Sequence, residues 1–83
     1  MAPKSSPRTL EAAFSLAVRQ HRERAGISQE ELGFRADLHR TYVSMLERNQ
    51  RCPSLTTIAK LAKALETKAS TLLVAAEKIA NDL

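Results

Sequence analysis

Arginine is the residue type whose placement in this sequence most clearly indicates a chemistry. Seven arginines and no lysine lie between Arg19 and Arg51, whereas the lysines lie at position 4 and from position 60 onward. The planar guanidinium donates paired hydrogen bonds to carboxylate, phosphate or guanine, which the point charge of lysine does not. The central segment therefore suggests an anionic partner of defined shape. A solvated basic face explains the charge equally well, and the net charge of +4 does not decide between the two.

Other kinds of chemistry find few residues to support them. Cys52 is the only cysteine, so it forms no internal disulfide or thiolate zinc site, and His21 and His39 are not spaced from it as metal ligands. The sequence has no glycine-rich phosphate loop, no paired nucleophile and base, and no cluster of carboxylates. We therefore expect no enzyme activity, no metal and no cofactor. The length of 83 residues suits a single domain, so we also expect no second domain that senses a small-molecule ligand.

The distribution of apolar residues along the sequence indicates the cellular compartment. No apolar run approaches the roughly 18 residues that a membrane span needs. The first residues also lack the apolar stretch of a secretory signal. We expect a cytoplasmic protein that makes no membrane contact.

The elements that must position the arginines are helices. Three aromatic residues occur, and alanine and leucine supply most of the apolar positions, which favours packed helices over a sheet. Apolar residues recur at helical spacing in successive segments. The expected helices cover residues 10–25, 29–36, 39 or 40–48, 55–65 and 71–83, with Thr9, Ser28, Ser54 and Ser70 as N-caps. Gly26 and Asn49 are expected to adopt the left-handed conformation after the first and third helices. The predicted fold class is all-α, a five-helix bundle preceded by a disordered arm over residues 1–8.

The segment 29–46 has the pattern of a DNA-binding helix-turn-helix. Its two short helices are joined by a turn of about three or four residues, and the small Gly33 allows them to pack closely. The buried set is expected to comprise Leu32, Ala36, Leu38, Val43 and Leu46. In this motif the first helix crosses the phosphate backbone and the second, the recognition helix, lies in the major groove. The side chains expected to face outward are His39, Arg40, Thr41, Ser44 and Met45.

Three stretches, in this order, resemble a known family. They are G-I-S-Q-E-E-L at 26–32, L-H-R-T-Y-V-S-M-L-E-R at 38–48 and R-C-P-S-L-T-T-I-A-K-L-A-K-A-L at 51–65. Together they are similar to the Xre and phage-repressor (Cro/C1-type) helix-turn-helix regulators, and the second stretch is most similar to the controller proteins of restriction–modification systems. The resemblance covers about residues 14–73. It implies a lambda-repressor-like DNA-binding domain, which we place at residues 9–83.

The resemblance also implies roles for individual residues. Contacts with bases are expected from Arg40, Thr41, Ser44 and Met45. Contacts with the phosphate backbone are expected from Gln29, His39, Tyr42, Arg48, Asn49, Gln50 and Arg51. A structural ion pair is expected between Arg22 and Glu47, joining the first helix to the recognition helix.

Several of these roles have alternatives. A guanidinium at Arg40 can bind the O6 and N7 atoms of guanine, but it can also bind a phosphate. Gln29 can be an ordinary exposed residue at a helix start, and His39 can simply cap the recognition helix. The loop over residues 48–51 can be a solvated loop.

Three positions depart from the family's pattern. Asp37 lies where a turn glycine is usual, but aspartate tolerates the left-handed conformation, so the turn should survive. Glu66 lies where glycine commonly ends the fourth helix, so that helix is expected to continue or to end by another geometry. His21 lies where leucine is usual, and we expect a core histidine rather than a ligand or a catalyst.

One recognition helix contacts too few base pairs for useful specificity, so a homodimer is expected. Two-fold symmetry places two recognition helices in successive major grooves about 34 Å apart. The last helix has a wider apolar arc than a core requires, although the surplus could also just complete the monomer core. The residues expected at the dimer interface are Leu73, Val74, Ala80 and Leu83.

The expected function is transcription regulation by binding double-stranded DNA at an inverted-repeat operator. Such a regulator represses or activates by excluding or recruiting RNA polymerase, and it is expected to control its own gene. The N-terminal arm, with Lys4 and Arg8, can add a contact with DNA. The alternative is an antitoxin or another protein-interaction module, but that function usually needs a tail, and only about ten residues are available beyond the bundle.

Overall fold

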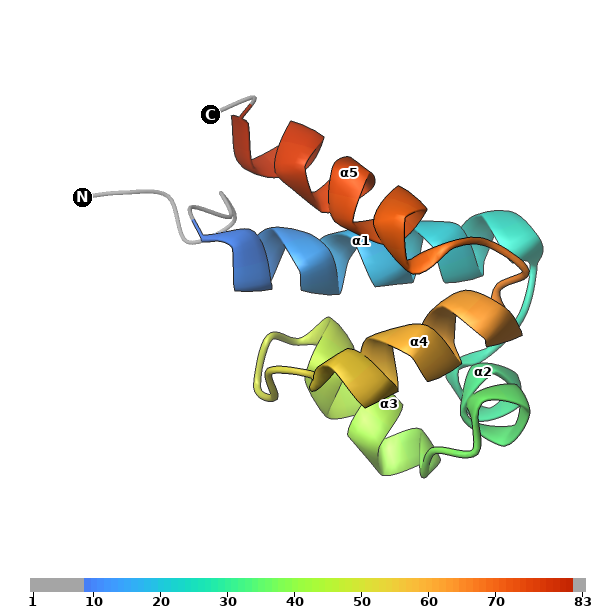
Figure 1. The fold of residues 1–83 in the computed structure, drawn as a ribbon. Helices are drawn as coiled ribbons and strands as arrows, with labels where there is room; N and C mark the ends of the chain where they lie inside the picture. Colours follow the sequence, from blue (N-terminus) through green and yellow to red (C-terminus); the bar gives the residue numbers. More distant parts are fainter. Residues whose placement is uncertain (1–8, 82–83) are drawn as a thin grey trace.

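The computed structural model describes residues 9–81, and within that range all regular structure is helical (Figure 1). The helices are α1 (Leu10–Ala25), α2 (Gln29–Ala36), α3 (Arg40–Glu47), α4 (Leu55–Ala64) and α5 (Ala69–Asn81). The predicted all-α fold is confirmed for these residues, and none of the helices is long and apolar enough to cross a bilayer. The predicted arm over residues 1–8 and the predicted interface residue Leu83 lie outside the described residues.

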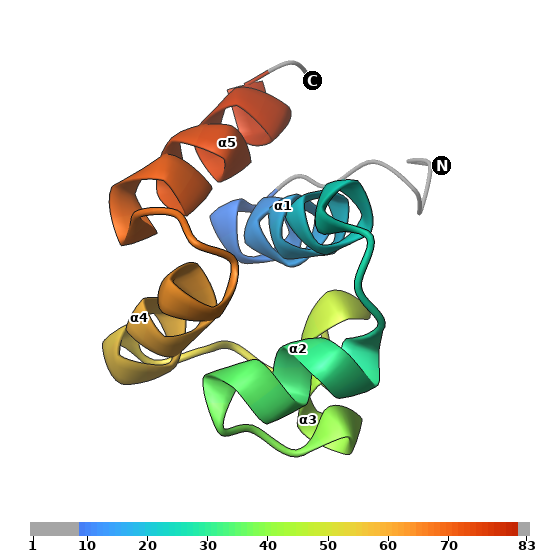
Figure 2. The same ribbon diagram turned by 90° about the vertical axis from the view of Figure 1, so that its right-hand side faces the viewer.

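α1 lies at the centre of the arrangement, between α5 and the other three helices (Figures 1 and 2). α5 packs along one side of α1, and the other side faces α2, α3 and α4 (Figures 1 and 2). The largest fully buried side chains are Val18, Leu32, Val43, Leu46, Leu61 and Leu72. Because α2 and α3 contribute half of this set, the position of these two short helices depends on the same core that holds the other helices together. Of the predicted buried residues, Leu38 is only half-buried and packs against that core.

The N-termini of three helices are capped as predicted. The hydroxyl of Thr9 accepts from the backbone N–H of Ala12 at 3.1 Å. Ser28 accepts in the same way from Glu31 at 3.0 Å, and Ser54 from Thr57 at 3.1 Å. Caps of this kind stabilise a helix by about 1 kcal/mol each. Short helices such as α2 need this support because few of their backbone groups are paired within the helix.

The first four helices all end on a residue in the left-handed conformation. These residues are Gly26 (φ 72°), Asp37 (φ 57°), Asn49 (φ 59°) and Glu66 (φ 56°). At each end, this residue and the next one donate to carbonyls of the last turn, the pattern of a Schellman motif. The left-handed conformations expected for Gly26, Asp37 and Asn49 are confirmed. The expectation that α4 continues or ends differently is wrong, because Glu66 adopts the left-handed conformation without being glycine.

The start of α5 differs from the prediction. The helix begins at Ala69, so Ser70 lies inside the first turn and is not the N-cap. The backbone N–H groups of Thr71 and Leu72 both bond to the carbonyl of Lys68, at 3.0 and 3.2 Å. The Schellman end of α4 directs the chain into the next helix after Lys68, which leaves no place for a cap at Ser70.

Gly33 allows α2 and α3 to approach closely, as the sequence predicts. A Cβ atom at this position would lie 2.6 Å from the carbonyl oxygen of Leu38 and 3.3 Å from the backbone nitrogen of Arg40. Both are backbone atoms at the start of α3, so they move only if the recognition helix moves. The absence of a side chain at Gly33 therefore sets the distance between the two helices.

Replacing Gly33 with alanine should destabilise the protein by about 1–3 kcal/mol, the usual cost of overpacking a tight contact. This loss should exceed the gain of up to about 1 kcal/mol that alanine ordinarily has over glycine inside a helix. Urea denaturation followed by circular dichroism measures the difference. The control is Phe34→Ala at the neighbouring exposed position, which should change stability by less than about 0.5 kcal/mol. A Gly33→Ala protein more stable than the parent would contradict the close approach.

Candidate nucleic-acid interface

Glu47, the last residue of α3, is the acceptor that joins three parts of the chain. Its carboxylate accepts from Nε of Arg22 at 2.7 Å and from Nη2 of the same guanidinium at 3.0 Å. It also accepts from Nε2 of Gln29 at 2.9 Å. The Glu47 side chain is 2% exposed and that of Arg22 is 13% exposed. The predicted ion pair between these two residues is therefore present and largely buried, and it ties α1, α2 and α3 together.

Arg22 has a further partner in the connection between α1 and α2. Its Nη1 atom donates to the carbonyl of Ile27 at 2.9 Å. The hydrogen bond with Glu47 raises the pKa of the Arg22 guanidinium above its ordinary value, although burial acts in the opposite direction. The charged form is thus the one that the fold stabilises, and the pair holds the recognition helix against the body of the protein.

A polar hollow opens in front of this brace, where the N-terminal ends of α2 and α3 meet. It has a volume of about 510 Å³ and is lined by Arg22, Ser28, Gln29, Glu30, Arg40, Thr41 and Ser44. We call it the α2–α3 hollow. The first turns of two helices present backbone N–H groups without helical partners, which favours an anion at such a place. The hollow is therefore suited to a phosphate group rather than to an apolar ligand.

Four of the residues predicted to contact DNA line the hollow, and they come from two helices. Arg40 and Thr41 are exposed at the start of α3, and Ser44 lies one turn farther along. Gln29 faces them from the first position of α2. Met45 does not line the hollow, although it lies one turn after Thr41 and is half-exposed.

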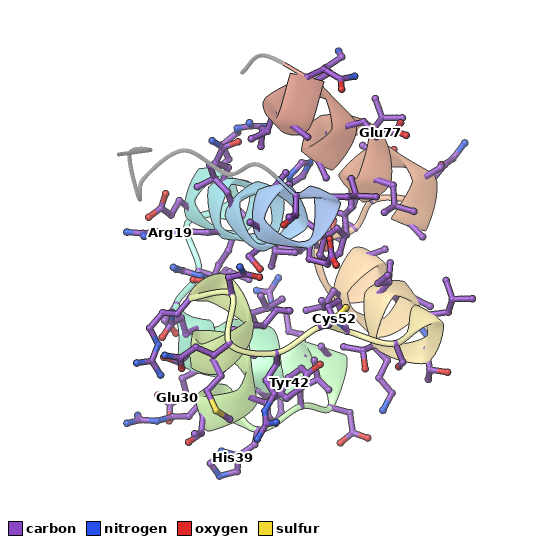
Figure 3. The ribbon with its side chains drawn as sticks, turned by 90° about the vertical axis from the view of Figure 1, so that its left-hand side faces the viewer. Arg19, Glu30, His39, Tyr42, Cys52 and Glu77 are labelled. Carbon is purple, nitrogen blue, oxygen red and sulfur yellow. The ribbon has the colours of Figure 1, made fainter. Side chains whose placement is uncertain are left out.

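Tyr42 and His39 do not line the α2–α3 hollow, although each is next in sequence to a residue that does. The ring of Tyr42 is half-buried and packs against the core, and its predicted phosphate contact stays a prediction. His39 is exposed and caps α3, because its Nδ1 atom accepts from the backbone N–H of Thr41 at 3.1 Å. The predicted alternative of a capping histidine is therefore confirmed. Figure 3 shows His39 and Tyr42 at the end of the molecule away from Glu77 and α5.

The loop after α3 carries the remaining predicted backbone contacts. Arg48, Asn49, Gln50 and Arg51 are all exposed. The left-handed residue Asn49 turns the chain, and the backbone N–H of Gln50 donates to the carbonyl of Met45 at 2.8 Å. These four residues follow the C-terminal end of α3, whereas the α2–α3 hollow lies at its N-terminal end. The two sets of predicted contacts therefore flank the recognition helix.

Glu30 lines the α2–α3 hollow but was not predicted to take part in the site. The available signal was its position next to Gln29, at the start of a helix expected to meet phosphates. A carboxylate there repels an approaching phosphate, and Arg40 across the hollow opposes that effect. Glu30 is thus a second acidic group near the recognition helix, but it is exposed, unlike Glu47.

The structure divides the residues predicted for the dimer interface. Leu73 lines an apolar cavity of about 160 Å³ together with Leu10, Glu11, Phe14, Cys52, Pro53 and Ile58, which we call the lateral cavity. Val74 instead borders a different hollow, beside His21 and Arg24 of α1. Successive residues of a helix point about 100° apart, so the two side chains leave α5 on different sides. Leu73 and Val74 therefore lie on different sides of α5, Ala80 packs half-buried against the core, and the dimer interface stays a prediction.

His21 is half-buried but does not belong to the buried core. Its Nδ1 atom lies 3.0 Å from the carbonyl oxygen of Ala17, one turn earlier in α1. The expectation of a core histidine is thus wrong, because His21 lines the open hollow that Val74 borders.

Comparison with known proteins decides the family. A family model described as Helix-turn-helix matches residues 18–72, a range that contains α2, α3 and α4. The chain belongs to this helix-turn-helix family. The resemblance seen in the sequence is confirmed, including its likeness to restriction–modification controllers.

Three relatives illustrate the match to this helix-turn-helix protein. The control protein C.BamHI of Bacillus amyloliquefaciens is 48% identical over 61 residues, which cover 72% of this chain and 75% of the relative. The crystal structure of the controller C.AhdI from Aeromonas hydrophila has a TM-score of 0.72 at 43% identity, covering 74% of this chain and 92% of that one. The controller C.Esp1396I, solved as a tetramer with its natural 35 base-pair operator, has a TM-score of 0.82 at 27% identity, covering 90% of this chain and 99% of that one.

Replacing Glu47 with alanine should lower the free energy of unfolding by about 3–5 kcal/mol, because the Arg22 guanidinium then lacks its counter-charge in a mostly buried place. Affinity for DNA should fall as well, since Gln29 and α3 lose their common acceptor. The control is Glu23→Ala, whose carboxylate is 54% exposed and pairs with Arg19 on the same helix. That change should cost less than about 1 kcal/mol. Thermal melts with the same midpoint for both variants would contradict a structural role for the buried pair.

Proposed function

We propose that this chain is a sequence-specific, double-stranded DNA-binding transcription regulator of the restriction–modification controller type. The observation that carries the proposal is the α2–α3 hollow, where Gln29 and Arg40 face the same space in front of the buried Arg22–Glu47 pair. A solved relative of similar fold is in complex with its operator, which supports DNA binding by this chain. Binding rather than catalysis is the proposed activity. The cytoplasm is its proposed place of action.

The proposed base contacts come from the exposed side of α3. Arg40 pairs with the O6 and N7 atoms of guanine, and the methyl group of Thr41 packs against a thymine methyl. Ser44 and Met45 lie one turn farther along and contribute less. All four side chains lie on the side of α3 opposite the buried Val43 and Leu46.

The proposed phosphate contacts flank these four residues. Gln29, His39 and Tyr42 bind on the N-terminal side of the recognition helix. Arg48, Asn49, Gln50 and Arg51 bind on its C-terminal side, along the loop. Contacts with phosphates fix the register of a protein on DNA but carry no sequence information themselves.

A homodimer is proposed because an inverted repeat needs two recognition helices about 34 Å apart. The lateral cavity is the best candidate for the interface, since Leu10 and Leu55 are exposed apolar residues on the elements around it. Leu73 and Ala80 belong to this proposed interface, as does Leu83, which lies outside the described residues. Figure 3 looks onto this face of the molecule, with Cys52 near its middle. A second copy would remove these apolar side chains from water.

Regulation is proposed to depend on the concentration of the dimer. Binding at an operator near the promoter of its own gene would exclude or recruit RNA polymerase. The amount of protein would then determine whether transcription is repressed or activated. The alternative of an antitoxin is not favoured, because the characterised relatives are controllers of restriction–modification systems.

Arg40→Ala should relax discrimination at one operator position by about 1–3 kcal/mol, because one bidentate contact with a base is lost. Arg51→Ala is the matched control on the other side of α3. It should weaken binding to all sequences alike and reduce the slope of log affinity against log salt by about 1. Selection of bound duplexes from a random pool, followed by binding titrations, measures both effects. Equal losses on cognate and random DNA for Arg40→Ala would refute its contact with a base.

Leu55→Lys should convert the dimer into a monomer at micromolar concentration, because a buried interfacial lysine without a partner is strongly unfavourable. The Leu55 side chain is 82% exposed, so the change should leave the fold intact. Val74→Lys is the control at another exposed apolar position, 48% exposed, on the other side of α5. Sedimentation velocity measures both variants. A dimer that survives Leu55→Lys but dissociates with Val74→Lys would move the interface to the opposite side.

A further inference from the structure

His39 uses one nitrogen of its ring for the fold and leaves the other exposed. The residue precedes α3 in an extended conformation (φ −68°, ψ 142°), and its Nδ1 atom accepts from Thr41 at 3.1 Å. An imidazole nitrogen accepts a hydrogen bond only when it carries no proton. The neutral ring that caps α3 therefore has its proton on Nε2, and Nε2–H is a hydrogen-bond donor.

That donor lies on the surface proposed to meet DNA. The His39 side chain is exposed and lies at the end of the molecule that carries the start of α3 (Figure 3). The charged groups nearest in sequence are Asp37, which lines the same open hollow as His39, and Arg40, the first residue of the helix. Their charges are opposite, so no net charge at this place opposes a phosphate.

We propose that His39 is a positioning residue that acts at both ring nitrogens, capping α3 through Nδ1 and donating Nε2–H to a phosphate of the DNA backbone. The inference rests on the proposed function and deepens it, since it names the atom that binds and the tautomer that allows binding. The phosphate bond requires the same tautomer as the cap. Binding and capping therefore stabilise each other.

His21 provides an internal comparison, because the chain has two histidines. Its Nδ1 atom faces the carbonyl oxygen of Ala17 at 3.0 Å, and a carbonyl oxygen only accepts. His21 must therefore carry a proton on Nδ1. In their neutral forms the two histidines are expected to be opposite tautomers.

The first experiment records the ¹⁵N shifts of both rings by long-range ¹H–¹⁵N NMR, on the full chain without DNA. In buffer at about pH 8.5, where imidazole side chains are neutral, His39 should show the Nε2–H pattern and His21 the Nδ1–H pattern. His21→Gln assigns the signals. An Nδ1–H pattern at His39, or rapid exchange between the two tautomers, would overturn the proposal without bearing on whether the protein binds DNA.

The second experiment separates the cap from the phosphate contact. His39→Ser keeps an oxygen that can cap α3 but removes the outer donor, whereas His39→Ala removes both. The serine variant should retain the melting temperature of the parent and bind about tenfold more weakly per protomer, on a selected operator and on a scrambled duplex alike. The alanine variant should lose stability as well. A serine variant with parental affinity would overturn the phosphate contact.

A duplex with single neutral methylphosphonate groups locates the phosphate. One substitution should weaken the parent protein about tenfold and leave the affinity of the His39→Ser variant unchanged. Equal weakening of both proteins at every position would show that His39 contacts no phosphate. Failure of the parent protein to bind any duplex would instead refute the proposed function, a result distinct from either outcome.

Discussion

The geometry of the DNA-facing surface depends on one carboxylate. Glu47 lies at the end of the recognition helix and is almost completely buried, and its two oxygens accept from α1 and from the first residue of α2. A carboxylate in such a place needs compensation for the water it has lost, and Arg22 together with Gln29 supplies it. The same bonds fix the direction of α3. The hydrogen bonds that compensate the buried charge of Glu47 are thus the same bonds that orient the recognition helix.

Backbone geometry, together with the ion pair, fixes the position of the recognition helix. Between α2 and α3 the chain must turn within a few residues, and it does so through the left-handed Asp37 and the close contact at Gly33. The other helix ends use the same hydrogen-bond pattern, although Gly26 is the one glycine among the four residues at this position. Side chains in the left-handed region cost roughly 1–2 kcal/mol each. The two hydrogen bonds at each end, and the core beneath them, offset this strain.

Features that act over a few residues could be predicted from the sequence. The caps at Thr9, Ser28 and Ser54 and the left-handed Gly26 depend on local bonds, so residue types were sufficient to place them. The start of α5 was misplaced because it depends on how the end of α4 directs the chain. The sides taken by Leu73 and Val74 depend on where α1 lies against α5, which no local signal contains. The presence of Glu30 in the α2–α3 hollow likewise reflects the tertiary arrangement of α2 and α3.

The α2–α3 hollow and the lateral cavity have no residue in common. The first is formed by α2 and α3 with Arg22 behind them, and the second by α1, α4, α5 and the segment before α4. Mutations can therefore accumulate in one surface without altering the side chains of the other. If both surfaces act as proposed, operator preference and self-association can diverge separately among descendants of this chain. Two paralogues in one cell could then bind different operators while still forming mixed dimers, or form separate dimers while still binding the same operator.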